Sequence, residues 1–363
     1  MKIKYIAYLF LTWVEKMAGR LPAVGRFRPI RGDFSALDLV NENKLVGHIH
    51  VPRQASGSCP AGSITQKCGH RQHDHQPWPI FWSKAENATL FGRTLMWRNE
   101  NDEICTEGSF GKINRLKLNE GPLLERLILP KPMRLEGAWT SLVSNWSHGH
   151  NYFHWITDSL TRLYLRDQLP ENTRILIPQN PPRFITDSLD MLGLSEMSQP
   201  SPSVGLNVEK YYFLSPMVLT GNHNPLGYAW LRDQFASFIN PVPNGRPIFL
   251  TRRGAARTPS NLLEIERIFE STGFDIVDCG SIGIKEQMRL SSSAPAISGL
   301  HGAAMTNIIW ATEGIPVLEI FEQSYLNGCY EQIAFERNLH YTAIIREHNI
   351  TDLISEWVDT LRR

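Results

Sequence analysis

A strong net charge, a regular set of cysteines and a long apolar run are all missing from this chain of 363 residues. Lys and Arg number 37 against 36 Asp and Glu, which leaves a formal charge of +1. A protein that binds nucleic acid through bulk charge carries a clear positive excess. The balance therefore argues against a nucleic-acid partner. The apolar share of 42% is ordinary for a soluble globular protein and is enough for a sizeable core.

The five cysteines are scattered and odd in number, which argues against a disulfide framework and favours a reducing compartment, the cytoplasm. One stretch gathers metal-binding residue types: Cys59, Cys68, His70, His73 and His75. The spacing of its cysteines fits no common zinc pattern, so an irregular loop is the favoured interpretation and a metal site the alternative. We therefore expect no metal.

The N-terminal apolar run, residues 5–14, is shorter than the roughly 20 residues that a membrane-spanning helix needs. Basic residues follow it at Lys16, Arg20, Arg26, Arg28 and Arg31. An amphipathic or core helix is the favoured interpretation. The alternative is a helix that lies on the inner face of a membrane as a peripheral contact.

Strand and helix patterns alternate from about residue 136 onward, which predicts an α/β protein with parallel, doubly wound sheets. Two prolines and a glycine fall within residues 240–245 and predict an interdomain linker. The expected parts are an N-terminal segment (1–35), a first lobe (36–240), a second lobe (241–345) and a C-terminal helix (346–363). The expected strands are 138–143, 174–177, 208–214, 247–251, 274–278, 296–299 and 316–321, and the expected helices are 150–168, 183–192, 226–238, 261–272, 285–292, 303–311 and 351–361.

The helix expected from residue 150 carries a chemically unusual polar face. Asn151, His154 and Asp158 share one side of it, away from an apolar stripe. His154 and Asp158 are four residues apart, so the carboxylate can orient the imidazole, or Asp158 can itself be the base. An ordinary solvated face is the alternative. The apolar stripe consists of Phe153, Ile156, Leu160 and Leu163.

A second motif, His301-Gly302-Ala303, joins an expected strand to an expected helix. Small residues at such a turn let a diphosphate approach the free N–H groups of the helix start. An empty tight turn is the alternative. The dinucleotide fingerprint G-x-G-x-x-G and the P-loop are both absent from the sequence.

Three arginines, Arg252, Arg253 and Arg257, follow the first strand of the expected second lobe. Ligands of doubly wound sheets gather at the carboxyl ends of strands, where arginines suit phosphate oxygens. A solvated basic loop is the alternative. Glu319 lies inside an apolar strand, and a buried carboxylate needs a partner: a ribose diol or a structural arginine.

Taken together, these residues resemble glycosyltransferase family 61, over residues 138–322. The family's pattern has Gly at the position of Ala304 and often Glu at that of Leu262. The resemblance implies a GT-B fold of two Rossmann-like lobes facing a cleft, and inverting chemistry without a required metal. It rests on Asn151, His154 and Asp158, on Arg252, Arg257 and Asn261, and on His301, Gly302, Ala303, Thr306, Asn307 and Glu319.

The function expected is transfer of a hexosyl or pentosyl group from a nucleotide sugar to a glycan or lipid-linked acceptor, in polysaccharide or capsule biosynthesis, with no cofactor. His154 and Asp158 are the predicted catalytic residues. Two alternatives stay open: a non-catalytic sugar-nucleotide or glycan-binding relative, and a nucleotide-dependent epimerase or oxidoreductase. The predicted substrate-binding residues are Asn151, Arg252, Arg253, Arg257, His301, Gly302, Ala303, Asn307 and Glu319.

Overall fold

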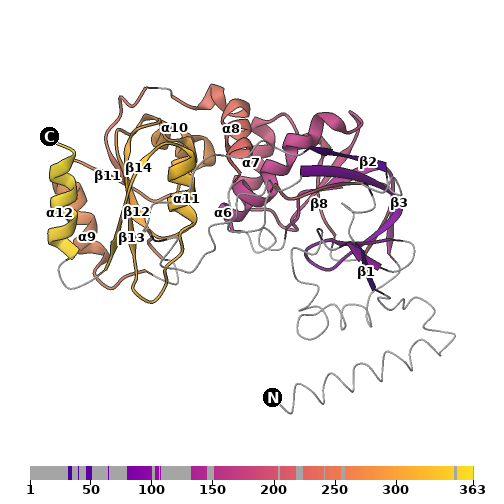
Figure 1. The fold of residues 1–363 in the computed structure, drawn as a ribbon, viewed down its shortest axis with the longest axis horizontal. Coiled ribbons are helices and arrows are strands. Elements are labelled where there is room, and N and C mark those ends of the chain that lie inside the picture. Colours follow the sequence, from indigo (N-terminus) through magenta and orange to yellow (C-terminus); the bar gives the residue numbers. More distant parts are fainter. Residues whose placement is uncertain are drawn as a thin grey trace, which may run out of the picture.

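The computed structural model describes residues 32–34, 40, 46–50, 64, 80–99, 103–105, 107, 132–144, 151–202, 205–217, 224–240, 242–254, 258–346 and 350–362. Two β-sheets, which we call sheet A and sheet B, organise these residues (Figure 1). The α/β class predicted from the sequence is thereby confirmed. The proposed membrane-surface segment and the stretch from Cys59 to His75 lie almost entirely outside the described residues.

Sheet A has nine strands in the order β1-β5-β4-β3-β9-β6-β7-β8, with β2 also paired to β3. Its pairs β9-β6, β6-β7 and β7-β8 are parallel, whereas β3 pairs with β2, β4 and β9 in antiparallel fashion. The sheet is therefore mixed, not wholly parallel as predicted. Its strands are β1 (Gly32–Phe34), β2 (Val46–His50), β3 (Ile80–Phe91), β4 (Met96–Arg98), β5 (Glu103–Cys105), β6 (Met133–Ser141), β7 (Arg174–Ile177), β8 (Ser198–Pro200) and β9 (Leu206–Leu214).

The sequence predicts one regular helix over residues 150–168, and the structure instead has an irregular one. One α-helical turn passes into a π-helical and then a 3-10 stretch, and Leu160 N–H bonds to Trp155 O across the wider π turn. The side chains of Thr157 and Thr161 also donate to the carbonyls four residues before them, a contact that bends helices. The helices of this region are α6 (Tyr152–His154), η4 (Trp155–Ser159), η5 (Leu160–Gln168), α7 (Arg183–Met191), η6 (Ser195–Met197), α8 (Pro225–Gln234) and η7 (Ala236–Phe238).

Sheet B has five parallel strands in the order β11-β10-β12-β13-β14. In chain order this is 2-1-3-4-5, an arrangement of doubly wound nucleotide-binding sheets, and it agrees with the strand–helix alternation of the sequence. Its strands are β10 (Ile248–Leu250), β11 (Asp275–Val277), β12 (Ile297–Leu300), β13 (Pro316–Phe321) and β14 (His340–Ile345), and its helices are α9 (Leu262–Ser271), α10 (Ile284–Ser293), η8 (Ala303–Trp310), α11 (Cys329–Glu336) and α12 (Ile350–Thr360).

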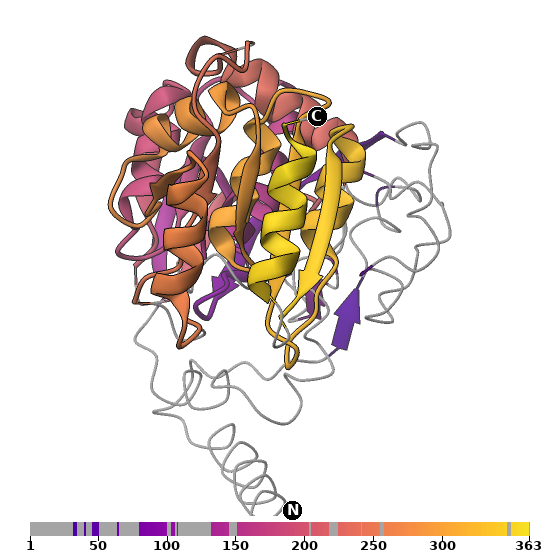
Figure 2. The same cartoon turned by 90° about the vertical axis from the view of Figure 1, so that its left-hand side faces the viewer.

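Helices cover both faces of sheet B, as the two views show (Figures 1 and 2). α9 and α12 pack on one face, around Phe249, Phe269 and Ile354. α10, η8 and α11 cover the other face and continue into the helices of sheet A. The predicted stripe of Phe153, Ile156, Leu160 and Leu163 belongs to this second core. The apolar core therefore runs without a break from one sheet to the other.

Two helix ends follow the sequence signals closely. Gly193 after α7 and Gly273 after α9 have positive φ values of 69° and 96°, the left-handed conformation that glycine tolerates best. The Pro- and Gly-containing segment from residue 240 lies between the last strand of sheet A and the first strand of sheet B. Its division of the chain into domains stays a prediction. Among the described helices, none is long and apolar enough to cross a bilayer.

Candidate active site

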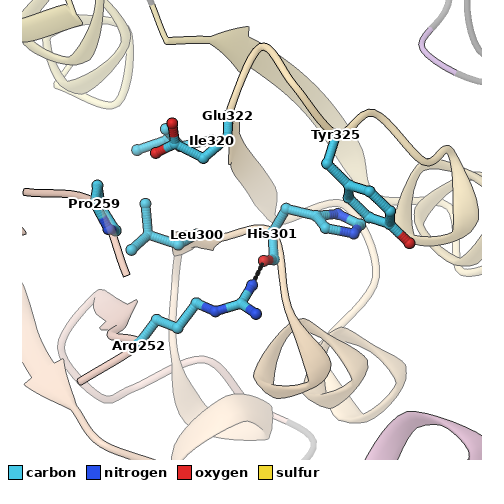
Figure 3. Close-up of a pocket in the computed structure, with 7 residues that line it drawn as sticks. All are labelled: Arg252, Pro259, Leu300, His301, Ile320, Glu322 and Tyr325. Carbon is cyan, nitrogen blue, oxygen red and sulfur yellow. Dashed lines mark hydrogen bonds between the residues drawn. The ribbon is translucent and has the colours of Figure 1, made fainter. Parts of the chain in front are cut away.

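The strand order of sheet B reverses between β10 and β12, and two predicted donor-site residues follow these strands directly. Arg252 comes two residues after β10, and His301 comes immediately after β12. The Arg252 guanidinium donates a hydrogen bond to the carbonyl oxygen of His301 (Figure 3). In doubly wound sheets this reversal point opens a crevice at the carboxyl ends of the strands, where ligands bind.

A pocket of about 280 Å³, open solvent included, lies at this edge. Figure 3 shows Arg252 on one side of it and the His301 imidazole near Tyr325 on the other. Its lining combines one guanidinium, one imidazole and one carboxylate with apolar side chains, a composition that is typical of small-molecule sites. The lining residues are Arg252, Pro259, Leu300, His301, Ile320, Glu322 and Tyr325.

Two glycines let the backbone and Arg252 come close together here. A Cβ on Gly299 would stand 2.6 Å from the sulfur of Met305 in η8, and a Cβ on Gly302 would stand 2.8 Å from a guanidinium nitrogen of Arg252. Neither position therefore accepts a side chain without a shift. The helix predicted from Ala303 is present, as a 3-10 helix. Its first N–H groups, those of Gly302, Ala303 and Ala304, precede the first bonded one, Met305 N to Gly302 O at 2.9 Å.

His301 is held by a carboxylate beneath it. Its Nδ1 lies 2.5 Å from Oε1 of Glu319, and the Tyr341 hydroxyl donates to Oε2 of Glu319 at 2.5 Å. Glu319 is fully buried. Its partners in the structure are His301 and Tyr341, in place of the ribose diol or arginine predicted. Burial raises the pKa of the Glu319 carboxyl, and the bonds from His301 and Tyr341 oppose that rise.

Arg253 does not line this pocket. Its guanidinium binds both oxygens of Glu266 in α9, at 2.9 and 2.8 Å, and that carboxylate also accepts from Thr251. Burial alone would raise the pKa of Glu266, but the hydrogen bonds from Arg253 and Thr251 lower it overall. Arg253 therefore fixes α9 to the end of β10, in place of the phosphate contact predicted from the sequence. Arg257 lies outside the described residues.

Asn307 joins the two sheet regions. The Tyr152 hydroxyl of α6 donates to its Oδ1 at 2.8 Å, and its Nδ2 donates to Gln287 Oε1 at 2.9 Å and to Ala304 O at 3.0 Å. Asn307 has no exposed surface. We therefore assign it a structural role, in place of the substrate contact predicted.

The His154–Asp158 pair predicted from the four-residue spacing is formed. His154 Nδ1 lies 2.8 Å from Oδ2 of Asp158, and Oδ1 of Asp158 accepts from Thr157 Oγ1 at 2.9 Å. The Asp158 side chain is 6% exposed and that of His154 15%. The alternative of an ordinary solvated face is therefore wrong for Asp158. Asn151 accepts a bond from His154 N at 3.5 Å and acts as the helix cap.

One turn after Asp158, Arg162 occupies the reversal point of sheet A. The parallel part of that sheet, β8-β7-β6-β9, reverses between β6 and β9. The buried Arg162 donates to Leu214 O at the end of β9, at 2.8 Å, and to Val143 O beyond β6, at 3.4 Å. Burial lowers its pKa to about 10, although Asp158 opposes the change. Arg162 thus fixes the helix that carries the His154–Asp158 pair.

A row of aromatic rings connects the two histidines. Phe153 contacts His154 with centroids 5.0 Å apart, and Tyr330 of α11 contacts Phe153 at 5.5 Å and His301 at 5.4 Å. The distance between the two imidazole centroids cannot exceed the sum of these three centroid distances. That sum is below the ~20 Å that modest domain motion covers. The pocket itself is lined only by the sheet B region, so a cleft shared with His154 and Asp158 stays a prediction.

The family model of glycosyltransferase 61 matches residues 152–318. This match confirms the resemblance read from the motifs. The matched region includes the His154–Asp158 pair, Arg252 and the turn at His301. A β-1,2-xylosyltransferase of Oryza sativa subsp. japonica, RCN11, is 32% identical over 84 residues, which are 22% of this chain. The chain matches only 16% of that relative's length.

Within the glycosyltransferase 61 region and just beyond it, sequence reasoning missed four polar residues: Tyr152, Arg162, Gln287 and Tyr341. Tyr341 was detectable only from sheet register. β13 and β14 pair Val317 with Tyr341 and Glu319 with Ala343, so Tyr341 and Glu319 are diagonal neighbours on one face. The sequence alone does not disclose that pairing.

Proposed function

We propose that the protein is a glycosyltransferase that moves a sugar from a nucleotide-sugar donor to a hydroxyl group of a glycan or lipid-linked acceptor. The single observation that carries this proposal is the meeting of Arg252, His301 and the Gly302 turn at the reversal point of sheet B. The match of residues 152–318 to glycosyltransferase 61 supports it independently.

The donor's diphosphate would lie against the start of η8. Gly302 and Ala303 offer backbone N–H groups without side chains that would block an approaching anion. Arg252 and His301 add a guanidinium and an imidazole at the same edge. These groups would stabilise the negative charge that grows on the departing diphosphate. We therefore propose a metal-independent reaction.

His154 is our proposed base, with Asp158 as the carboxylate that orients it. Both oxygens of Asp158 are hydrogen-bonded and its side chain is nearly buried. A base must reach the acceptor hydroxyl, and His154 is the more exposed of the two. With Nδ1 bound to Asp158, Nε2 is the nitrogen that would take the proton. Attack by the acceptor on the face opposite the diphosphate would invert the anomeric centre.

The matched relative is named for xylose transfer, so a pentose is one donor sugar to test, and hexoses are the other. The basic N-terminal region is compatible with a lipid-linked acceptor at the cytoplasmic face of a membrane. Neither choice affects the assignment of the diphosphate site.

Removal of the Arg252 side chain tests the donor site. Arg252→Ala should weaken binding of a nucleoside diphosphate tenfold to a hundredfold, because one charged hydrogen bond to phosphate contributes about 1.5–3 kcal/mol. Calorimetry with UDP and GDP measures this loss.

The matched control is Arg253→Ala, which removes the same charge at the next position but only breaks the pair with Glu266. It should lower stability and leave the affinity of the folded protein within about threefold. Equal affinities in wild type and Arg252→Ala would contradict the proposed site.

A further inference from the structure

We propose that Tyr341 and Glu319 form a relay that fixes the tautomer and charge of His301, so that His301, when protonated, binds the leaving diphosphate through Nε2. This inference rests on the proposed function for its ligand. Tyr341 and Glu319 act here as positioning residues, because neither lines the pocket.

The geometry of the carboxylate sets the tautomer. Both oxygens of Glu319 are engaged, one with His301 Nδ1 and the other with the Tyr341 hydroxyl, each at 2.5 Å. When Glu319 is ionised it only accepts, so the proton of this hydrogen bond then lies on Nδ1 of His301. Nε2 is then the atom that changes state. Within the described part of the chain it has no hydrogen-bond partner, and the ring lines the pocket.

The aromatic surroundings hold the ring in this orientation. Phe321 stacks on His301 with centroids 4.9 Å apart and planes 22° apart, and Tyr325 and Tyr330 contact the ring at 5.3 and 5.4 Å. A ring packed on several sides cannot turn to exchange its two nitrogens freely. The relay therefore presents one nitrogen, in one direction, to the ligand.

The charge of Glu319 gives the relay its effect on the reaction. An ionised Glu319 holds a protonated His301 by charge as well as by its hydrogen bond, and a protonated His301 has a hydrogen on Nε2 to donate to a phosphate oxygen. Tyr341 remains a donor at neutral pH, because burial and the nearby Glu319 raise its pKa well above the ordinary value. The titratable groups that face the His301–Glu319 pair are Glu322 after β13, Tyr325 in the following loop, Cys329, Tyr330 and Glu331 of α11, Tyr341 of β14 and Arg252 after β10.

Two substitutions should move the protonation of this pair in opposite directions. Glu319→Gln removes the negative charge, so the site should take up its proton at lower pH. Tyr341→Phe keeps the negative charge of Glu319 but removes a hydrogen-bond donor that stabilises it, so the pair should take up its proton at higher pH. Each change should displace the midpoint by about one pH unit, since one hydrogen bond or one shielded charge is lost.

The experiment uses the full chain with ¹⁵N-labelled histidine. The ¹⁵N shifts of His301, assigned with a His301→Gln sample, report its tautomer and midpoint, and calorimetry with UDP and GDP at several pH values reports binding. The matched control is Tyr330→Phe, since Tyr330 also touches the His301 ring, whereas the hydroxyl that donates to Glu319 is that of Tyr341. We expect Nδ1–H in the wild type, opposite displacements in the two variants, and no displacement in the control.

The relay is contradicted if Tyr341→Phe leaves the midpoint where the control does, or if neutral His301 carries its proton on Nε2. Should Glu319→Gln fail to fold, the Tyr341→Phe comparison decides alone. If the ¹⁵N results hold but neither nucleotide binds at any pH, the relay stands as a property of the free protein, and both its proposed ligand and the proposed function fail.

Discussion

At the scale of single residues, the chain builds two histidine–carboxylate pairs by different routes. His154 and Asp158 meet because four residues along a helix bring side chains together. His301 and Glu319 meet because adjacent parallel strands pair Gly299 with Glu319, which places the residue after β12 next to that carboxylate. Both carboxylates are buried and bonded on both oxygens, so each acts by holding its histidine.

The proton-transfer assignment predicts a strong effect at Asp158. Asp158→Asn should lower transfer by about 10²–10⁴-fold, the usual contribution of a general base such as His154. The reason is that an amide no longer orients the His154 ring so that its Nε2 accepts the proton. Binding of the nucleoside diphosphate should persist, since that site lies in the sheet B region. Initial rates and calorimetry on the same preparations measure both quantities.

The double variant with His154→Ala should lose little more than either single variant, because the pair acts as a unit. Thermal unfolding of each variant separates lost chemistry from lost structure. Additive losses would mean that the two residues have separate roles, and a normal rate in Asp158→Asn would exclude it from the transfer step.

At the scale of elements, Arg162 explains why the His154 helix is fixed where sheet A reverses. Replacing it by Met should destabilise the protein by about 2–5 kcal/mol, because two buried carbonyls lose a charged donor and Asp158 loses a nearby cation. Urea unfolding measures the change.

Arg166→Met is the matched control on the same helix. Arg166 is partly exposed and donates to a single carbonyl, that of Glu171, so its loss should cost no more than about 1 kcal/mol. Equal destabilisation by the two substitutions would show that Arg162 does not hold the helix.

The same scale shows what the sequence could predict. Strand and helix positions in sheet B followed from apolar runs and glycine stops, as at Gly273 after α9. The π turn at Trp155 did not, because it has no sequence period of its own, and Asp158 is buried within it. Asn307 and Arg253 were assigned to the ligand because their partners, Tyr152 and Glu266, are found only once the elements are packed.

At the scale of the whole molecule, the helices between the two sheets pack around one continuous apolar core. The apolar core extends from the helix of Phe153 to η8 and α11. Arg232 of α8 donates to the carbonyls of Ile309, Trp310 and Ala311 at the end of η8, and burial lowers its pKa to about 10. Wide hinge opening along this contact would expose that core, so we infer that substrate entry involves smaller movements at the carboxyl edges of the sheets.

One measurement tests the central claim, transfer from a nucleotide sugar, most directly. The full chain is incubated with a panel of UDP- and GDP-linked pentoses and hexoses, with and without EDTA, and release of the nucleoside diphosphate is followed. The account predicts release from at least one donor, unaffected by EDTA and reduced at least tenfold in both His154→Ala and Arg252→Ala. No release from any donor, or equal release in both folded variants, would contradict it.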